Sequence, residues 1–212
     1  MPMNTVISKL SRGELSFGPD TIYVSKELFR GNQSVRKVNL PTSLQIIKKD
    51  AFNGCENLRT VSLHYGLKEI RTRAFCFTPK LTAIEFPESL TRIGHDSFWG
   101  SGLKEIRIPG SVKDIEPYTF AECRSLKRVV LEPGVERISY RAFWECEALE
   151  HVLFRSSVKI ICEEAFAECV SLKTVSLPRG CEVMENAFPP TCKVEYLSPE
   201  MMALEPFKWV FQ

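Results

Sequence analysis

Apolar residues recur along the chain with a fixed spacing. A phenylalanine, usually preceded by alanine or serine, marks each unit, and successive marker phenylalanines lie 22 or 23 residues apart. Further apolar residues follow at nearly constant offsets: one at six residues, a pair at nine and eleven, and then a Leu-x-x-Ile segment beyond a frequent proline. The marker residues are Phe29, Phe52, Phe75, Phe98, Phe120, Phe143, Phe166 and Phe188.

Each unit predicts three short elements. The Val-x-Leu segment, as at residues 61–63, alternates with period two and predicts a strand with one buried face. The Leu-x-x-Ile segment, as at residues 67–70, predicts a second and shorter extended piece. The stretch around Ala-Phe is too short for a regular helix and predicts a helical turn.

Stacking of the units predicts the fold. One unit of this length cannot bury its apolar side chains alone, whereas stacked units share a continuous core. We therefore expect a repeat solenoid, mainly β with short helical turns, with about eight coils of 22–23 residues over residues 15–197. Successive coils should pair through their backbones, and the marker phenylalanines should form an internal spine. Residues 15–24 fit the frame as a degenerate first copy.

The repeated unit resembles a known family. The pattern Leu-x-x-Ile-x-x-x-Ala-Phe-x-x-Cys-x-x-Leu-x-x-Val-x-Leu-Pro is similar to the BspA-like leucine-rich repeat of bacteria and protists. It is most complete at residues 44–63, and the resemblance extends over about residues 15–197. It implies a leucine-rich-repeat solenoid. It also implies a binding role, because members of this family are often surface proteins that bind host proteins or other cells.

Both ends of such a stack need cover, because the last coils would otherwise expose the core. Residues 1–14 are predicted to be an N-terminal cap segment, and residues 198–212 a C-terminal capping tail. Ser198 and Pro199 suit the N-cap and the first position of a short helix in that tail. A second interpretation makes the tail an apolar docking hook. The hook would consist of Phe207, Trp209, Val210 and Phe211.

Charge and hydropathy narrow the classes of protein to which this chain can belong. The chain carries 28 Lys and Arg against 26 Asp and Glu, a net charge of +2, and a nucleic-acid binder of this size usually shows a larger basic excess. No apolar run approaches the roughly 18 residues of a membrane span. No apolar signal segment is visible near the first residue, so we expect a cytoplasmic protein, with the cell surface as the alternative.

The cysteines follow the repeat rather than a disulfide pattern. Four of them occupy one slot, three residues after the marker phenylalanine, which favours a small buried side chain. Three of the four lie on consecutive coils and cannot all pair, so reduced and buried thiols are predicted. The slot holds Cys55, Cys123, Cys146 and Cys169, and the irregular Cys181 and Cys192 are the one pair that merits a disulfide test.

The sequence contains no motif that indicates catalysis. Cysteine and histidine lack zinc-ligand spacing, and no nucleophile elbow, phosphate-binding loop or dinucleotide fingerprint occurs. His95, Asp96 and Ser97 are triad residue types, but their adjacency indicates a surface turn. We expect no enzyme activity and neither a cofactor nor a metal.

The outward residues of the strands include one apolar pair. Most of these positions are polar, whereas Val130 and Leu153 are apolar neighbours on adjacent coils. Arg107, Arg128 and His151 surround them, and an apolar centre with a basic rim is typical of a protein-binding surface. The alternatives are cover by a neighbouring loop and isolated surface apolar residues.

Two further features bear on binding. Trp99 and Trp144 directly follow their marker phenylalanines, two coils apart, and are either a second anchor pair or packing for the turn side of the coils. A basic stripe precedes the strands, and we expect neighbouring glutamates to neutralise it. The stripe consists of Arg36, Arg59, Lys104, Lys127 and Lys173.

The sequence as a whole predicts a non-catalytic protein-interaction module or scaffold. A protein partner would bind through the outward strand face, without nucleic acid and without membrane insertion. The alternative is an adhesin-like surface module that uses the same face to bind a host protein or a glycan.

Overall fold

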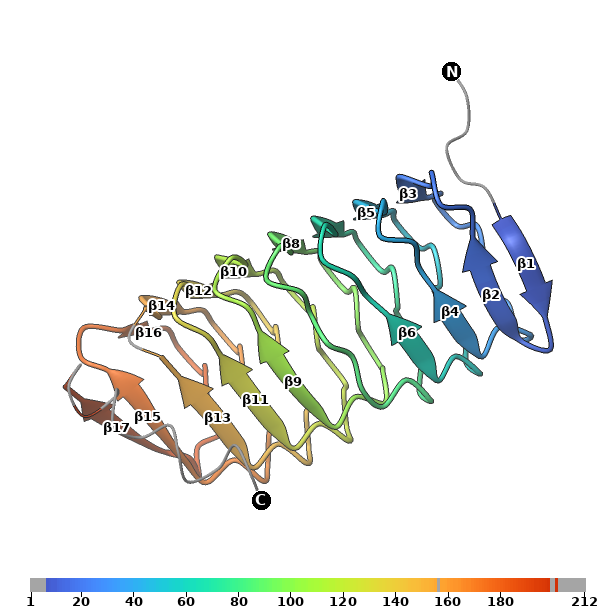
Figure 1. Ribbon diagram of the computed structural model, residues 1–212. Helices are drawn as coiled ribbons and strands as arrows, with labels where there is room; N and C mark the ends of the chain where they lie inside the picture. Colours follow the sequence, from blue (N-terminus) through green and yellow to red (C-terminus); the bar gives the residue numbers. More distant parts are fainter. Residues whose placement is uncertain (1–6, 156, 199–200, 202–212) are drawn as a thin grey trace.

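Each repeat unit forms one coil, and the coils stack into a rod (Figure 1). The structure, a computed structural model, describes residues 7–155, 157–198 and 201. A coil has three sides: a long strand from the Val-x-Leu segment, a short strand from the Leu-x-x-Ile segment, and a turn segment that carries the marker phenylalanine. We call these the long-strand face, the short-strand face and the turn face.

Strands of the long-strand face are parallel because every coil returns to the same starting point. In register, Val38 lies opposite Val61 and Val129 opposite Val152, so equivalent repeat positions face each other. The first strand, β1, is the exception and runs antiparallel to β2. The strands are β1 (Ile7–Ser11), β2 (Glu14–Phe17), β4 (Lys37–Asn39), β6 (Thr60–Ser62), β9 (Glu105–Ile108), β11 (Arg128–Leu131), β13 (His151–Phe154), β15 (Thr174–Pro178) and β17 (Lys193–Leu197).

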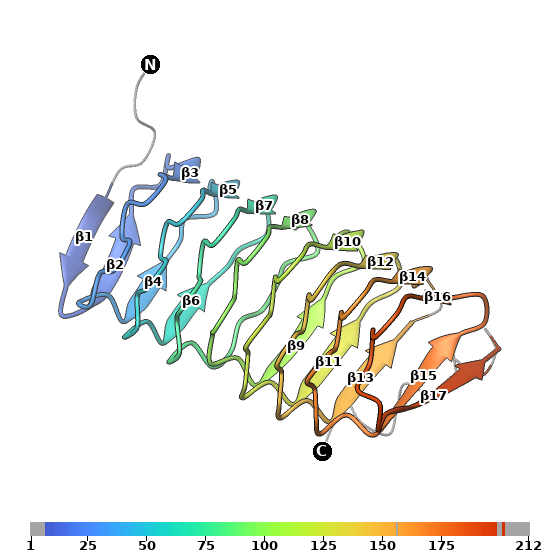
Figure 2. The same cartoon turned by 180° about the vertical axis from the view of Figure 1, so that it is seen from behind.

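The short-strand face consists of two-residue strands, which Figure 2 shows in series from behind. They form two sheets of four strands, which meet between β8 and β10 without pairing. These strands are β3 (Tyr23–Val24), β5 (Ile46–Ile47), β7 (Glu69–Ile70), β8 (Arg92–Ile93), β10 (Asp114–Ile115), β12 (Arg137–Ile138), β14 (Ile160–Ile161) and β16 (Glu182–Val183).

The core is the predicted spine of phenylalanines. All eight marker rings stack in sequence from Phe29 to Phe188, with successive ring centroids 4.9–5.5 Å apart. Leucine, isoleucine and valine of the two strand faces complete a single buried cluster along the rod. The solenoid and the spine are therefore confirmed, and residues 15–24 form the first coil, since β2 and β3 pair with the strands of the next one.

The turn face differs from the helical turn that we expected. From Phe29 to Phe166, the residues two before and two after each marker phenylalanine have positive φ, as at Asp50 (57°) and Gly54 (71°), so the backbone alternates in handedness and does not coil as a helix. This alternation points every second N–H toward the next coil, while the N–H groups between them donate within their own turn. Phe52 N–H donates to the Ala74 carbonyl one coil later (2.8 Å), and the same bond recurs from coil to coil.

Backbone pairing on the long-strand face is interrupted twice, which corrects the expectation of a strand in every coil. Residues 82–86 form no strand between β6 and β9, although Ile84 and Phe86 fit the Val-x-Leu pattern. The next coil reaches its strand one residue early, at Leu103 after Phe98, and this shift disturbs the register. The second interruption separates β13 from β15, which pairs with β17 instead.

The structure describes more of the predicted N-terminal cap segment than of the predicted C-terminal tail. β1 covers the outer edge of β2 at the N-terminal end. At the other end, Met201 N–H donates to Ser198 Oγ (3.5 Å), which agrees with the predicted N-cap. The apolar hook at residues 207–211 and the rest of the predicted capping tail lie outside the described residues.

Candidate functional site

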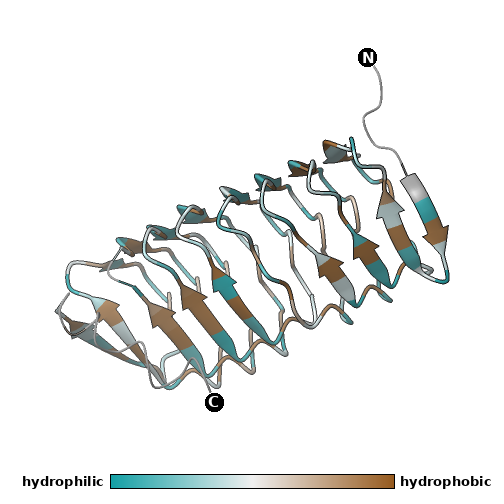
Figure 3. Ribbon diagram, viewed as in Figure 1, coloured by the Kyte–Doolittle hydropathy of each residue, from teal (hydrophilic) through white to brown (hydrophobic). Residues whose placement is uncertain are grey.

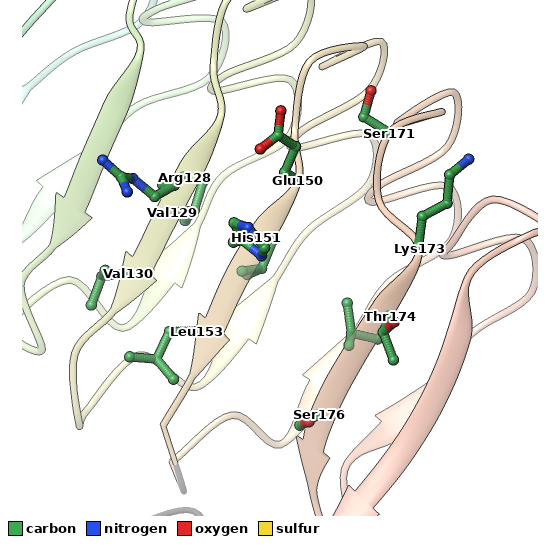
Figure 4. Close-up of a pocket in the computed structure, with 12 residues that line it drawn as sticks. Arg128, Val129, Val130, Glu150, His151, Leu153, Ser171, Lys173, Thr174 and Ser176 are labelled. Atoms are coloured by element: carbon green, nitrogen blue, oxygen red, sulfur yellow. The ribbon is translucent and has the colours of Figure 1, made fainter. Parts of the chain in front are cut away.

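A pocket of about 470 Å³ opens on the long-strand face where β13 and β15 separate (Figure 4). Its walls come from three consecutive coils, through β11, β13 and β15. The lining residues are Arg128, Val129, Val130, Glu150, His151, Val152, Leu153, Ser171, Lys173, Thr174, Val175 and Ser176.

The pocket lies where one backbone hydrogen bond between neighbouring coils is not formed. In the two preceding coils, Lys127 N–H donates to the Lys104 carbonyl (2.7 Å) and Glu150 N–H to the Lys127 carbonyl (3.0 Å). The equivalent bond from Lys173 to Glu150 is not formed, although the whole segment belongs to the described part of the chain. The two strands therefore do not pair, and the pocket lies at this unpaired border.

The floor of the pocket is apolar. Val129, Val152 and Val175 occupy the inward position of their strands, and Val129 and Val175 are 1% and 2% exposed. Val152 is only partly buried, because the neighbouring strand does not close over it. An apolar side chain of a partner that entered here would lose its contact with water against these valines.

The predicted apolar pair lies beside the pocket. Val130 and Leu153 are directly opposite each other on paired strands, and both are half-buried and line the opening (Figure 4). Figure 3 shows the result as a hydrophobic stretch along β11 and β13, where the neighbouring β9 alternates. Side chains on adjacent coils thus form one apolar surface that extends to the floor of the pocket.

The charged rim differs partly from the expected one. Arg128 and His151 line the pocket, and Arg128 is ion-paired with Glu105 of the preceding coil. Arg107 does not line it; its Nε lies 2.8 Å from Glu132 Oε1, and it borders a second pocket of about 350 Å³.

Two rim residues were missing from the set of site residues that the sequence predicted. Glu150 and Lys173 border the opening from the residues that precede β13 and β15. Lys173 was recognised only as a member of the basic stripe. The interruption of that stripe by Glu150 is visible in the sequence, but nothing in the repeat pattern links it to a gap between strands.

The second pocket lies at the other interruption of the long-strand face. Ile84, Glu85, Phe86 and Glu88 line it together with Arg107 and Pro109. Phe86 is only half-buried, and its ring packs edge-on against two spine phenylalanines, Phe98 at 5.5 Å and Phe120 at 6.4 Å. The aromatic wall of the second pocket is therefore fixed by the core. The volume of this pocket is smaller than that of the first.

The two predicted tryptophan anchors belong to the turn face and line neither pocket. Trp99 stacks on Tyr118, with ring centroids 5.5 Å apart, and Trp144 lies under the guanidinium of Arg141 at 5.3 Å. Tyr140 joins the two, because it packs edge-on against Tyr118 and also contacts Arg141. Both tryptophans therefore pack within one aromatic series along the turn face, apart from Val130 and Leu153.

The described residues do not assemble a catalytic or metal-binding group. His95 Nδ1 lies 2.8 Å from Asp96 Oδ1, whereas Ser97 is fully buried and its hydroxyl has no hydrogen-bond partner in this part of the chain. A triad geometry is not formed. The three residues do lie in a turn, but Asp96 and Ser97 are buried, so the expectation of a surface position is wrong for these two. No cluster of three or more His, Cys, Asp or Glu suited to a metal ion occurs in the ranges that the structure covers.

Comparison with known proteins identifies the family of the repeat. The family model described as BspA type leucine rich repeat region matches residues 22–105 and 91–200. No curated protein is similar in sequence to this chain. Within the described residues, no helix has the length and apolar character needed to cross a membrane.

Three similar solved structures come from bacteria. A leucine-rich repeat protein of T. pallidum is 31% identical with a TM-score of 0.70, covering 76% of this chain and 78% of that one. One from Bacteroides ovatus is 19% identical with a TM-score of 0.63, covering 91% and 66%. A leucine rich cell surface protein of Faecalibacterium prausnitzii is 18% identical with a TM-score of 0.54, covering 93% and 76%.

Proposed function

Because the chain belongs to the BspA-type leucine-rich repeat family, whose repeats generally mediate protein interactions, we propose that it is a protein-binding module that acts through its long-strand face. The observation that carries the proposal is the pocket between β13 and β15, with Val130 and Leu153 beside it. The fold is typically a non-enzymatic scaffold, and the proposed role requires no chemistry from the side chains.

The shape of this surface supports an anchored mode of binding. A flat polar sheet offers a partner little apolar area to bury. The pocket, by contrast, has an apolar floor and walls that come from three coils. Residues at the centre of an interface contribute most when neighbouring contacts exclude water from them. We therefore expect the partner to insert one apolar side chain beside Val130 and Leu153, and to contact Arg128 and His151 at the rim.

A variant pair tests the proposal. Val130→Asp with Leu153→Asp adds charge at the pocket, and Val130→Ser with Leu153→Ser removes the apolar surface more gently if the first pair disturbs folding. The matched control is Asn39→Asp with Ser62→Asp, which adds two carboxylates at the same repeat positions of two other adjacent coils. Circular dichroism establishes that each variant is folded.

The measurement is capture from cytosolic extract and from surface extract in parallel, followed by titration calorimetry with each purified partner. We expect the dissociation constant to rise roughly 10- to 100-fold in the pocket variants and to stay within about twofold in the control. A partner found only in the surface extract would favour the adhesin-like alternative through the same face. A partner whose affinity is insensitive to both pocket pairs would contradict the proposed site.

A further inference from the structure

Basic side chains occupy the residue directly before five strands of the long-strand face. We call them the basic ridge. Backbone hydrogen bonds hold two pairs of them in register, from Arg59 N–H to the Arg36 carbonyl (2.8 Å) and from Lys127 N–H to the Lys104 carbonyl (2.7 Å), so the residues of each pair lie about 4.8 Å apart. Thr82 separates the two pairs, and Glu150 separates the second pair from Lys173. All members are exposed. They are Arg36, Arg59, Lys104, Lys127 and Lys173.

The ridge carries charge that the chain does not neutralise. We expected neighbouring glutamates to pair with these residues, and this expectation is wrong: within the described ranges, none of the five makes an ion pair. Three acids of this face pair with cations outside the ridge. Glu105 is paired with Arg128, Glu132 with Arg107 and Glu14 with Lys37.

The short-strand face shows that this excess is local. Directly before the short strands from β5 to β14, three basic residues occur with two neutral ones and one acid, and Lys159 Nζ lies 2.6 Å from Glu136 Oε2. The residues at these positions are Gln45, Lys68, Thr91, Lys113, Glu136 and Lys159. Two borders of one rod with the same backbone geometry thus differ in charge.

The ridge continues into the pocket. Lys173 belongs to both, and the rim also contains Arg128, which is ion-paired with Glu105, together with His151 and the acid Glu150. We propose that the partner presents an acidic polypeptide segment, whose carboxylates lie along the ridge while one apolar side chain enters the pocket. This inference rests on the proposed function and specifies the chemistry of the partner.

A protein segment matches these observations better than a nucleic acid does. The pocket requires an apolar side chain beside the charges, and the ridge residues include no aromatic ring on which bases would stack. Unpaired exposed cations also raise the rate of encounter with an acidic surface, an effect that salt suppresses.

Synthetic probes test the inference directly. A fluorescent 12-residue peptide with a central phenylalanine flanked by glutamates is titrated with the full chain by fluorescence anisotropy, beside a peptide with glutamine in place of every glutamate and a 12-nucleotide oligothymidylate. We expect the glutamate peptide to bind roughly tenfold more tightly than the glutamine peptide, and less tightly as salt is raised. Equal affinity for the two peptides, or oligothymidylate that binds as tightly, would overturn the inference.

Matched charge reversals locate the binding site. Lys104→Glu with Lys127→Glu should weaken the glutamate peptide roughly tenfold, whereas Lys68→Glu with Lys113→Glu, the same charge change on the short-strand face, should change affinity less than twofold. Equal losses in both pairs would show a nonspecific effect of net charge and overturn the inference.

The two proposals fail separately. If Val130→Asp with Leu153→Asp abolishes binding while the ridge variant binds as the wild type does, the ridge inference is wrong and the proposed site stands. If the ridge variant loses binding while the pocket variant retains it, the acidic partner is supported and the proposed pocket is overturned.

Discussion

At the scale of the residue, the cysteine slot has a role beyond its small volume. Cys55 Sγ donates to the Phe29 carbonyl (3.0 Å) and Cys146 Sγ to the Phe120 carbonyl (3.2 Å), so each thiol bonds to the marker residue of the preceding coil. In the coil where threonine occupies this slot, the Thr78 hydroxyl donates to the carbonyl of its own marker Phe75 (2.8 Å). The slot thus selects a small side chain that is also a hydrogen-bond donor.

These thiols should be unreactive in the folded protein. Burial raises the pKa of Cys55 to about 11 and that of Cys123 to about 12, and all eight cysteines are free. Because the thiolate is the reactive form, alkylation of both thiols by iodoacetamide at pH 8 should be at least about 100-fold slower than in the urea-unfolded chain. Mass spectrometry of each cysteine peptide against time measures this, and equal rates would contradict it.

The same shifts have a consequence for stability. A thiol whose pKa is higher in the folded state holds its proton while the unfolded chain loses it. The contribution of these thiols to the free energy of unfolding should therefore be constant below the unfolded pKa of about 8.5 and should be lost as pH rises from there toward about 11 or 12.

The sequence predicts the cysteine slot but not the carbonyl that accepts a hydrogen bond from its thiol. Spacing after Phe52 and Phe143 predicted that Cys55 and Cys146 are buried and equivalent, because periodicity reports which positions share an environment. The accepting carbonyl lies one coil away, and its direction depends on the backbone dihedral angles of the turn face, which periodicity does not encode.

At the scale of the element, the turn face maintains a backbone that most side chains disfavour. Positive φ costs an L-residue about 1–2 kcal/mol, yet Asp50, Tyr118 and Arg141 adopt it. The coil-to-coil hydrogen bonds of the turn face offset this cost. The Ala-Phe stretch predicted a helical turn because a short apolar cluster fits either geometry, and only the partners of its N–H groups distinguish the two.

One substitution on this face should be stabilising. Glu168 has a φ of 62°, at the repeat position where other coils have Gly31, Gly54 and Gly100. Glu168→Gly should raise the free energy of unfolding by roughly 0.5–1 kcal/mol, because glycine adopts positive φ without strain. Guanidinium unfolding measures the change. The neighbouring Ala167→Gly, where φ is not positive, should lower stability by a similar amount, and the same sign in both would refute the explanation.

The gap between β13 and β15 should be visible in amide exchange. The His151 amide donates to the Lys127 carbonyl (3.2 Å), whereas the equivalent bond from Thr174 to Glu150 is not formed in the described chain. Hydrogen exchange of the Thr174 amide should therefore be at least about 100-fold faster than that of His151, since the first needs no opening of a backbone bond. NMR exchange rates at a single pH decide this, and similar protection of both amides would contradict the gap.

Part of the candidate site could be predicted from the sequence, because periodicity reports which positions share an environment. Val130 and Leu153 were placed side by side correctly, because equal offsets from two marker residues fix equal heights on adjacent coils. The pocket was not predicted, since Val175 and Leu177 continue the strand pattern without a break. Sequence alternation reports which face a residue occupies, and it does not report whether two neighbouring strands pair.

At the scale of the whole molecule, the two ends of the rod are built differently. β1 pairs antiparallel with β2 and covers the edge that the first coil would otherwise expose. At the far end, Pro190 occupies the position two residues after the last marker, Phe188, where earlier coils carry an N–H that donates to the next coil. Proline has no such N–H, so this position cannot continue the hydrogen-bonding pattern.

We propose that residues 1–14 act as the N-terminal cap, and deletion of residues 1–13 tests this. The variant should melt several degrees lower, because the edge of β2 and the end of the core are uncovered, and it should self-associate through that edge. Thermal unfolding and analytical ultracentrifugation at several concentrations measure the two effects. An unchanged melting temperature together with a monomeric variant would show that this segment is not a cap.

The coil-to-coil hydrogen bonds of the marker residues give the turn face an electrical direction. Every marker N–H from Phe29 to Phe166 points toward the C-terminal end, and the carbonyls that accept these bonds point back. Each peptide group carries a dipole of about 3.5 D, and aligned groups add, as they do in a helix. The N–H groups just before the strands, such as those of Gln45 and Arg59, donate to the preceding coil and so point toward the N-terminal end. The turn face and the strand borders are therefore polarised in opposite directions, and Pro190 withholds one donor from the turn face at its C-terminal end.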